Sequence, residues 1–366
     1  MTATKTERGI REAVARTQEV TDASLIDRLS DTGRRRFLKR AGLATMGAFL
    51  GANLPLQNQM PTGFVPKARA ASGIRKPEDF KHHTVQLKEV KMHYVREGKG
   101  PPLLLWHGWP GFWWEWHKNI GELAKHFDVI VPDMRGYGDT EKPDLKKIEN
   151  FHLNKVVEDY AQLMEALDIK DAFIVGHDYA SVVAHKFVRK YRNKVRKACI
   201  IDAIVPGFGP RYLSVGHFPE SWYSQFHQLD MAVELVNHSR ETTKIYFKHF
   251  FSHWSYNKNL ITDEEMEILT DNFVKAGNVH GGFNFYRANL SITSNPWTPL
   301  DRTISDLPTT FLWGMGDPVV PSVWSNDVAL WYNNYTMEYV PDGGHFLMWE
   351  KPDLVNDRLK KAFLGK

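Results

Sequence analysis

Cysteine is almost absent from this sequence, since Cys199 is the single one among 366 residues. An intramolecular disulfide and a cysteine-based metal site are therefore excluded. The stretch 41–56 is apolar, but three glycines and Asn53 interrupt it, and it is shorter than the ~20 residues that a membrane-spanning helix needs. The sequence also lacks any G-x-S-x-G motif, so a serine nucleophile on a strand-to-helix turn is not expected.

Composition and charge are those of a globular protein that can bury a large core. Hydrophobic residues make up 42% of the chain and charged residues 25%, which excludes a largely disordered chain. The net charge of +4 comes from the N-terminal segment, because residues 1–70 hold twelve Lys and Arg against six Asp and Glu. A basic arm on a nearly neutral body favours a targeting segment over a polyanion-binding surface. We expect no nucleic-acid partner and no stable membrane anchor.

The first 70 residues have the layout of an export signal with a flexible N-terminus. Arg34, Arg35 and Arg36 precede Phe-Leu-Lys and the weakly apolar stretch 41–56, and a small-residue cleavage site lies near Ala70/Ala71. This order is typical of targeting segments, which are not part of the fold. It resembles a twin-arginine signal, which implies the twin-arginine export machinery as a partner and a periplasmic or secreted protein. A basic tail on a cytoplasmic protein is the alternative.

The body alternates short β-like runs with helical patterns from about residue 83. This alternation predicts an α/β fold with a mostly parallel sheet and helices on both faces. Eight strands are expected, near 85–89, 91–97, 102–106, 128–131, 172–176, 198–202, 309–313 and 336–340. Helices are expected near 113–126, 152–168, 180–192 and 352–363.

Strand signals vanish between 206 and 300, where the long amphipathic stretches 227–253 and 263–276 occur. Their periodicity predicts a helical cap inserted after the sixth strand. The cap would divide the core into 71–205 and 301–366. Ligands of open α/β sheets bind at the carboxyl ends of the strands, so we expect the cap to cover that edge.

The run Val-Gly-His-Asp-Tyr-Ala at 175–180 lies between a predicted buried strand and a predicted helix. Small residues two before and two after the central position are typical of a nucleophile elbow, here with Asp178 as the central residue. Asp317 and His345 follow the last two predicted strands. The order nucleophile, acid, histidine is the one that α/β-hydrolases use. Asp202, which also follows a strand, is the alternative acid.

A turn rich in glycine and proline, His-Gly-Trp-Pro-Gly at 107–111, follows the third predicted strand. Backbone N–H groups of such a turn can hold a developing oxyanion. We expect the N–H groups of Trp109 and Tyr179 to form the oxyanion hole, and His107 and Trp109 to contact the substrate.

Five stretches of the body resemble the branch of the α/β-hydrolases that contains epoxide hydrolases and the haloalkane and haloacetate dehalogenases. They are HGWPGFWWEW at 107–116, PDMRGYGDTEKP at 132–143, VGHDYA at 175–180, WGMGDP at 313–318 and GGHF at 343–346. The resemblance covers residues 80 to 366. It implies an α/β-hydrolase fold, an Asp178 nucleophile that forms an ester, and His345 as the base that activates water for its hydrolysis.

The cap should distinguish an epoxide from a halide, because an alkoxide leaving group needs a proton donor. Epoxide hydrolases of the branch donate from cap tyrosines, and Asn-Phe-Tyr-Arg at 284–287 resembles their motif. The resemblance implies Tyr286 as the first donor and Tyr223 as the second, with His227 as the alternative to Tyr223. Trp222 is a further candidate for substrate contact.

The expected activity is hydrolysis of a small apolar epoxide to a vicinal diol. Haloacid dehalogenases of the branch carry arginines one and four residues after the nucleophile, where this chain has Tyr179 and Val182. Dehalogenation of a haloacid or haloalkane by the same aspartate remains the first alternative. A non-catalytic binder of small apolar ligands is the second. No cofactor and no metal are expected, and the oligomeric state stays open.

Overall fold

The structure is a computed structural model that describes residues 73–205, 208–290 and 303–365. The predicted export signal, its cleavage site at Ala70/Ala71 and the cap boundaries near 206 and 300 lie outside these residues. Within the described part, no helix combines the length and the hydropathy needed to cross a membrane.

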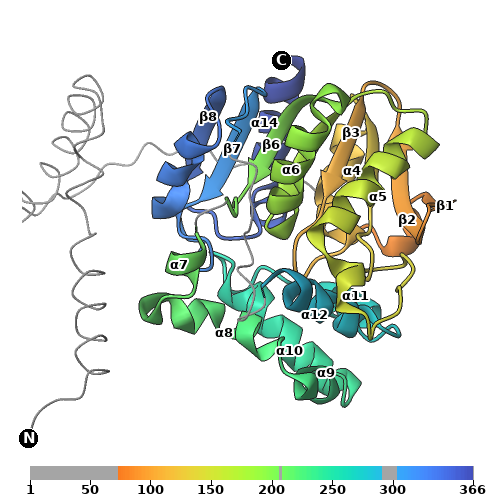
Figure 1. Ribbon diagram of the computed structural model, residues 1–366, viewed down its shortest axis with the longest axis vertical. Helices are drawn as coiled ribbons and strands as arrows, with labels where there is room; N and C mark the ends of the chain where they lie inside the picture. The colour runs from red at the N-terminus through yellow and green to blue at the C-terminus, as the bar shows by residue number, and fades with distance from the viewer. Residues whose placement is uncertain (1–72, 206–207, 291–302, 366) are drawn as a thin grey trace, which may run out of the picture. The chain divides into compact units, whose positions relative to one another are not determined.

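An eight-stranded sheet forms the centre of the body, as predicted (Figure 1). The strand order is β1-β2-β4-β3-β5-β6-β7-β8. β2 pairs antiparallel with both β1 and β4, and the other neighbours are parallel. The strands are β1 (His82–Gln86), β2 (Lys91–Gly98), β3 (Pro102–Trp106), β4 (Asp128–Pro132), β5 (Ala172–His177), β6 (Val195–Ile201), β7 (Thr309–Gly314) and β8 (Tyr335–Val340).

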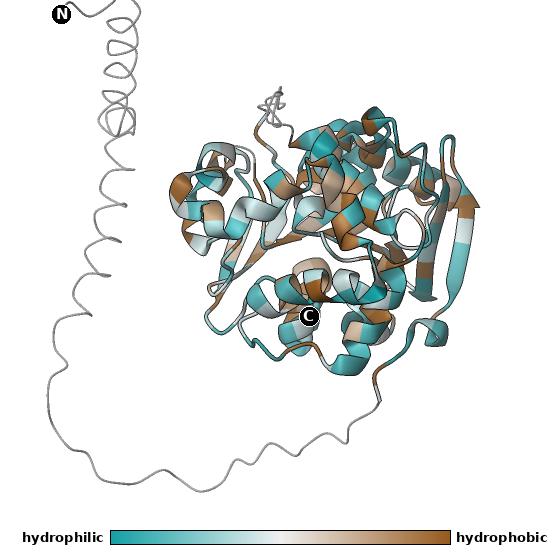
Figure 2. Cartoon of the chain, turned by 90° about the horizontal axis from the view of Figure 1, so that it is seen from below, coloured by the Kyte–Doolittle hydropathy of each residue, from teal (hydrophilic) through white to brown (hydrophobic). Residues whose placement is uncertain are grey.

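Helices cover both faces of the sheet. Figure 1 shows α5 (Leu153–Ala166) and α6 (Tyr179–Lys190) on one face, with α4 (His117–Leu123) and α14 (Pro352–Leu364) on the other. Short helices connect these elements: η1 (Pro77–Asp79), η2 (Trp113–Trp116), η3 (Ile148–Phe151), η4 (Arg192–Lys194), η6 (Ser322–Leu330) and α13 (Leu347–Glu350). β3, β4 and β5 are buried along nearly their whole length, because helices exclude water from both sides of a parallel sheet. Helices in Figure 2 carry both hydropathy colours, as amphipathic covering helices do.

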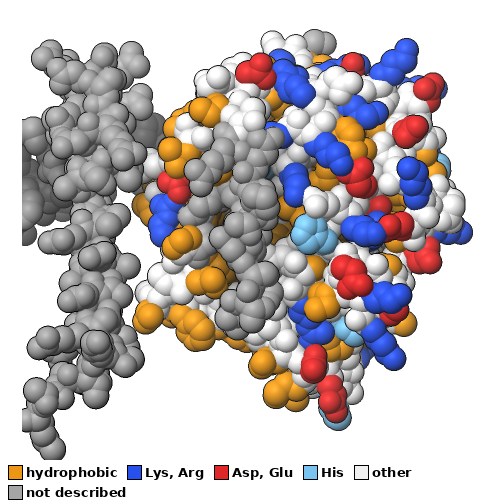
Figure 3. All heavy atoms as spheres, in the orientation of Figure 1, with side chains coloured by type: hydrophobic (Ala, Val, Ile, Leu, Met, Phe, Trp, Pro, Cys, Tyr) orange, Lys and Arg blue, Asp and Glu red, His pale blue; other side chains and the backbone are white. Residues whose placement is uncertain are grey.

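Between β6 and β7 the chain forms a helical cap, which lies beneath the sheet in Figure 1. Its helices are α7 (Gly209–Tyr212), η5 (Val215–His217), α8 (Phe218–Phe226), α9 (Asp230–Val236), α10 (Arg240–His253), α11 (Asp263–Phe273) and α12 (Asn278–Asn289). α12 packs against η3 and α5 of the core. The cap therefore joins the core on the side where the chain leaves β3 and β5. On the described part of the face in Figure 3, Lys and Arg alternate with Asp and Glu.

Several predicted element boundaries differ from the structure, and two of the differences have a clear local cause. The first strand was expected at 85–89, but β1 ends at Gln86 because the N–H of Leu87 donates to the carbonyl of Val90 at 2.9 Å and closes a turn. The stretch 227–253 was expected as one amphipathic segment. It is divided into α9 and α10, because the Ser239 side chain accepts a hydrogen bond from the N–H of Thr242 and begins a new helix.

The order of the strands predicts where a site can form. The chain passes from β3 outward to β4 and then returns to β5 on the other side of β3. Such a reversal leaves a crevice at the carboxyl ends of the two central strands. The loop after β3 and the turn after β5 meet at this crevice.

Candidate active site

Asp178 occupies a strained turn between β5 and α6, with φ of 51°. Few residues other than glycine adopt this left-handed region, so the surrounding structure must hold the turn. A Cβ on Gly176 would lie 2.7 Å from the carbonyl oxygen of Ala180. The close approach of strand and helix explains the small residues at both positions, and it presents the carboxylate at the edge of the sheet.

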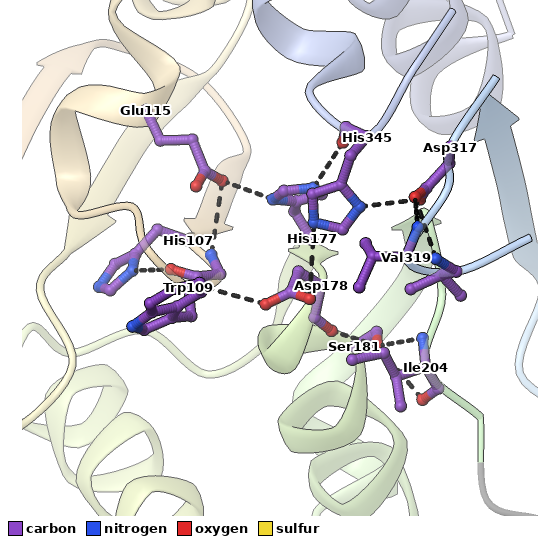
Figure 4. Close-up of polar contacts among 12 residues, drawn as sticks. His107, Trp109, Glu115, His177, Asp178, Ser181, Ile204, Asp317, Val319 and His345 are labelled. Atoms are coloured by element: carbon purple, nitrogen blue, oxygen red, sulfur yellow. Dashed lines mark hydrogen bonds and ion pairs between the residues drawn. The ribbon is translucent and has the colours of Figure 1, made fainter. Parts of the chain in front are cut away.

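Asp178, His345 and Asp317 lie in one line of contacts (Figure 4). The Nε2 atom of His345 is 3.5 Å from Oδ2 of Asp178, and its Nδ1 donates to Oδ2 of Asp317 at 2.8 Å. The N–H groups of Val319 and Val320 donate to Oδ1 of Asp317 at 2.8 and 3.0 Å. All three side chains are buried. The acid is thus fixed at both oxygens, and it fixes the orientation of the imidazole.

The pKa of His345 is raised well above its usual value. Burial acts in the opposite direction, but the negative charge of Asp317 and the hydrogen-bonding and charge of Asp178 outweigh it. In the free protein the imidazole is therefore held in its protonated form between two carboxylates.

Asp202 lies nearby but has a different environment. Its Oδ1 accepts the N–H of Gly314 at 2.8 Å, and its buried Oδ2 has no hydrogen-bond partner among the described residues. Burial first, and then the charge of Asp317, raise the pKa of Asp202 well above its usual range. A carboxyl that stays protonated cannot be the charged partner of His345. The geometry thus places Asp317, and not the alternative acid, against Nδ1.

The loop after β3 brings a backbone donor to the carboxylate. The N–H of Trp109 donates to Oδ1 of Asp178 at 2.8 Å. A Cβ on Gly108 would lie 2.5 Å from Cβ of Asp178, so only glycine permits this approach. The N–H of Tyr179 belongs to the first turn of α6, where amides have no partner within the helix. The predicted donor on Trp109 therefore binds the carboxylate, and the predicted donor on Tyr179 directly follows Asp178 in the chain.

Two residues predicted to contact the substrate, His107 and Trp222, make other contacts in the described structure. Nδ1 of His107 lies 2.9 Å from the carbonyl of Gly108, and its Nε2 accepts the N–H of Met134 at 3.0 Å. With both nitrogens bound to backbone and no exposed surface, His107 fixes the loop. Trp222 is half-buried and packs on Phe250 of α10, with 6.0 Å between ring centroids. Adjacent residues of a helix face different directions, so Trp222 points away when Tyr223 faces the site.

Tyr223 and Tyr286, here called the tyrosine pair, both pack against the ring of Trp109, the residue whose N–H binds the carboxylate. Their ring centroids are 5.6 Å apart, and Tyr223 stacks on Trp109 at 4.9 Å with an interplanar angle of 8°. Tyr286 meets the ring of Tyr179 edge-on at 4.7 Å. Burial, followed by the neighbouring tyrosines and Asp178, raises the pKa of both hydroxyls of the pair well above the usual value. Both hydroxyls thus keep their protons, as proton donors must.

His227, the alternative donor, is built into the wall of the cap. Its ring stacks on Phe283 at 3.8 Å, and its Nε2 bonds to the hydroxyl of Tyr246 at 2.7 Å. Burial and the charge of Arg287 lower its pKa well below the usual value. A neutral imidazole bonded to another residue is a poor acid, so Tyr223 is the better placed of the two.

The sequence interpretation missed a buried pair beside the elbow, Glu115 and His177. Nδ1 of His177 lies 2.9 Å from Oε1 of Glu115, and its Nε2 donates to the carbonyl of His345 at 2.8 Å (Figure 4). The N–H of Gly108 approaches the same carboxylate oxygen at 3.4 Å. This pair ties the loop of β3, the elbow and the histidine loop together. The signal available was a charged residue within the aromatic run 112–116.

Comparisons with known proteins agree with this geometry. A family described as alpha/beta hydrolase fold matches residues 101–352. The soluble epoxide hydrolase of Corynebacterium sp. (strain C12) is 30% identical over 302 residues, covering 78% of this chain and 98% of that protein. Epoxide hydrolase 1 of Caenorhabditis elegans is 28% identical over 310 residues, covering 83% of this chain and 74% of the relative.

A solved structure gives the same result for the fold. The epoxide hydrolase CorEH without ligand superposes with a TM-score of 0.69 at 26% identity, over 78% of this chain and 99% of that one. The chain therefore belongs to the alpha/beta hydrolase fold family, as a hydrolase whose homologues include epoxide hydrolases.

Proposed function

We propose that the chain is an epoxide hydrolase that acts through an ester of Asp178. One observation carries this proposal: a carboxylate occupies the nucleophile elbow beneath the tyrosine pair, whose buried hydroxyls keep their protons. A carboxylate displaces a leaving group from saturated carbon without a base, and an alkoxide leaving group needs a proton. The homologues named epoxide hydrolase support the same reaction.

In the first half-reaction, Oδ2 of Asp178 attacks an epoxide carbon, because Oδ1 is already held by the N–H of Trp109. The ring C–O bond breaks, and its electron pair stays on oxygen. A hydroxyl of the tyrosine pair transfers its proton to that oxygen. Asp178 is then an ester, with Oδ1 as the carbonyl oxygen in the oxyanion hole.

The second half-reaction begins when the imidazolium of His345, which the charge of Asp178 no longer stabilises, returns a proton to the tyrosinate. The neutral His345 then removes a proton from water, and the oxygen of that water attacks Cγ of Asp178. The N–H groups of Trp109 and Tyr179 stabilise the oxyanion. Collapse of the intermediate breaks the bond between Cγ and the ester oxygen, and the second proton of the water moves from the Asp178 carboxyl to the leaving alkoxide. The diol is released, and Asp178 is again a carboxylate. Asp317 stabilises the imidazolium that forms, through its contact with Nδ1.

The lining of the cavity beside the tyrosine pair favours a small apolar substrate. It consists of Tyr179, Ile204, Phe208, Tyr212, Tyr223, Leu290, Val320 and Trp324. Tyr179 and Val182 are buried at the positions where haloacid dehalogenases of the branch carry arginines. A haloacid carboxylate would find no cation at these two positions.

Isotope labelling during a single turnover tests this function. With enzyme in excess over styrene oxide in H₂¹⁸O, the first diol should be unlabelled and Asp178 should gain one ¹⁸O, because water attacks Cγ and not the epoxide. Mass spectrometry of the diol and of the Asp178 peptide measures both. Chloroacetate should release no chloride. Labelled diol in the first turnover would exclude the ester, and chloride release without diol formation would favour the dehalogenase.

We also propose that residues 1–70 direct export through the twin-arginine machinery. The support is the order of Arg34–Arg36, the apolar stretch 41–56 and the site at Ala70/Ala71. Receptors read the arginines themselves and not only their charge. Replacing all three by lysine should therefore move the protein from periplasm to cytoplasm in a bacterium that has this machinery. Fractionation and intact mass measure it, with Arg28→Lys as control. An unchanged distribution would contradict the proposal.

A further inference from the structure

A third tyrosine of the cap contacts the tyrosine pair from behind. The hydroxyl of Tyr212, the last residue of α7, donates to the hydroxyl oxygen of Tyr223 at 2.8 Å. Both side chains are buried, and both line the cavity that is assigned above to the substrate. Sequence reasoning did not single out Tyr212, and the proposed mechanism does not use it.

Tyr212 is held from several sides. Its N–H donates to the carbonyl of Phe208 at 2.8 Å, and its ring lies 5.5 Å from that of His217. The neighbouring Arg211 forms an ion pair with Asp327 of η6 and lies over the ring of Trp324. The hydroxyl is therefore fixed by the attachment of α7 to the core.

The direction of this hydrogen bond determines where the proton of Tyr223 can point. A tyrosine hydroxyl has one proton and can accept as well as donate. Because Tyr223 accepts from Tyr212, its own proton is free for another acceptor. The ring of Tyr223 is fixed against Trp109, between Tyr212 and Tyr286.

We propose that Tyr212 is a positioning residue that orients the proton of Tyr223 toward the epoxide oxygen and stabilises the tyrosinate as that proton leaves. The inference rests on the proposed epoxide hydrolase function. As Oδ2 of Asp178 bonds to carbon and the C–O bond breaks, the Tyr223 proton moves to the epoxide oxygen. The Tyr212 hydrogen bond then changes from one between neutral groups to one with an anion, which is stronger. Tyr212 thus stabilises the transition state more than the bound substrate.

A double-mutant cycle in the His345→Gln background isolates ester formation, which rapid quenching and intact mass can follow with 1,2-epoxybutane. Tyr212→Phe should slow ester formation about tenfold to a hundredfold, the range for a hydrogen bond to a charged group. In a Tyr223→Phe background the same change should have almost no effect, because the group through which it acts is gone. Tyr160→Phe is the control, since it removes a buried hydroxyl to which the described part of the chain offers no hydrogen-bond partner.

The leaving group supplies a readout that a merely structural role would not change. Chlorine makes the alkoxide of epichlorohydrin a weaker base than that of 1,2-epoxybutane, so it depends less on proton donation. The Tyr212→Phe effect should therefore be smaller with epichlorohydrin. Equal effects on both epoxides, or an undiminished effect in the Tyr223→Phe background, would overturn the inference. If the protein with Tyr212 intact forms no ester, this result contradicts the proposed epoxide hydrolase function. It is distinct from the results above, which contradict the positioning role of Tyr212.

Discussion

Replacing His345 by glutamine is expected to trap the protein as an ester of Asp178 and to lower kcat for styrene oxide by about 10⁴-fold. Ester formation needs Asp178 and the tyrosine pair, and none of these is changed by the substitution. Hydrolysis of the ester needs a base near Cγ, and Nε2 of His345, 3.5 Å from Oδ2, is the one that the described structure places there. The first half-reaction should proceed, and the second should stop.

Intact mass after incubation with styrene oxide should show one added substrate mass, and peptide mapping should place it on Asp178. The matched control is the double variant Asp178→Ala/His345→Gln, which keeps the altered histidine position and should gain no mass. A turnover close to that of the unchanged protein would contradict the assignment of His345. An adduct on another residue would contradict the nucleophile.

The charge of the nucleophile explains why His345 acts as a base in the second half-reaction. Asp178 and Asp317 both raise the pKa of His345 in the free protein. When Asp178 becomes an ester, its negative charge is lost. It then no longer stabilises the imidazolium, and the pKa of His345 falls. The imidazolium can then return a proton to the tyrosinate, and the neutral imidazole can accept one from water. Formation of the ester on Asp178 therefore makes His345 able to act as the base that hydrolyses the ester.

The sequence predicted the reacting groups well because each one is marked by its backbone. Asp178 requires a small residue two positions before it and two positions after it, and Gly108 is needed for the approach of the loop after β3. Asp317 follows a strand with the recognisable apolar run Phe-Leu-Trp, and His345 follows a pair of glycines after the last strand. These constraints are local, so they remain visible in a single sequence.

Residues that act through tertiary contacts were harder to predict. His107 and Trp222 belong to motifs, but a motif does not show which way a side chain points. The partners Glu115 and His177 are 62 positions apart, and only the folded loops bring them together. Tyr212 lies on a helix of four residues with no periodicity to detect. Its role depends on one hydroxyl contact to Tyr223.

Asparagine substitutions should separate the two candidate acids. Asp317→Asn is expected to lower kcat by about 10⁴-fold, as loss of the charged partner of a catalytic histidine does in a comparable triad. The amide presents either an oxygen or an uncharged N–H₂ group to Nδ1, and neither stabilises the imidazolium as a carboxylate does. Steady-state kcat with styrene oxide measures the loss, and thermal melting of both variants checks that they fold.

Asp202→Asn should change kcat less than about tenfold, because the substitution imitates the state that this residue already has. Its raised pKa keeps the carboxyl protonated, and an amide has nearly the same shape and one oxygen that can still accept the N–H of Gly314. A larger loss for Asp202→Asn than for Asp317→Asn would show that Asp202 is the charged acid. Both carboxyls lie near the imidazole, so the expected result depends on one physical difference between them. Oδ1 of Asp317 accepts from two backbone N–H groups and its Oδ2 accepts from His345, whereas Asp202 lacks this pair of bonded oxygens in the described structure.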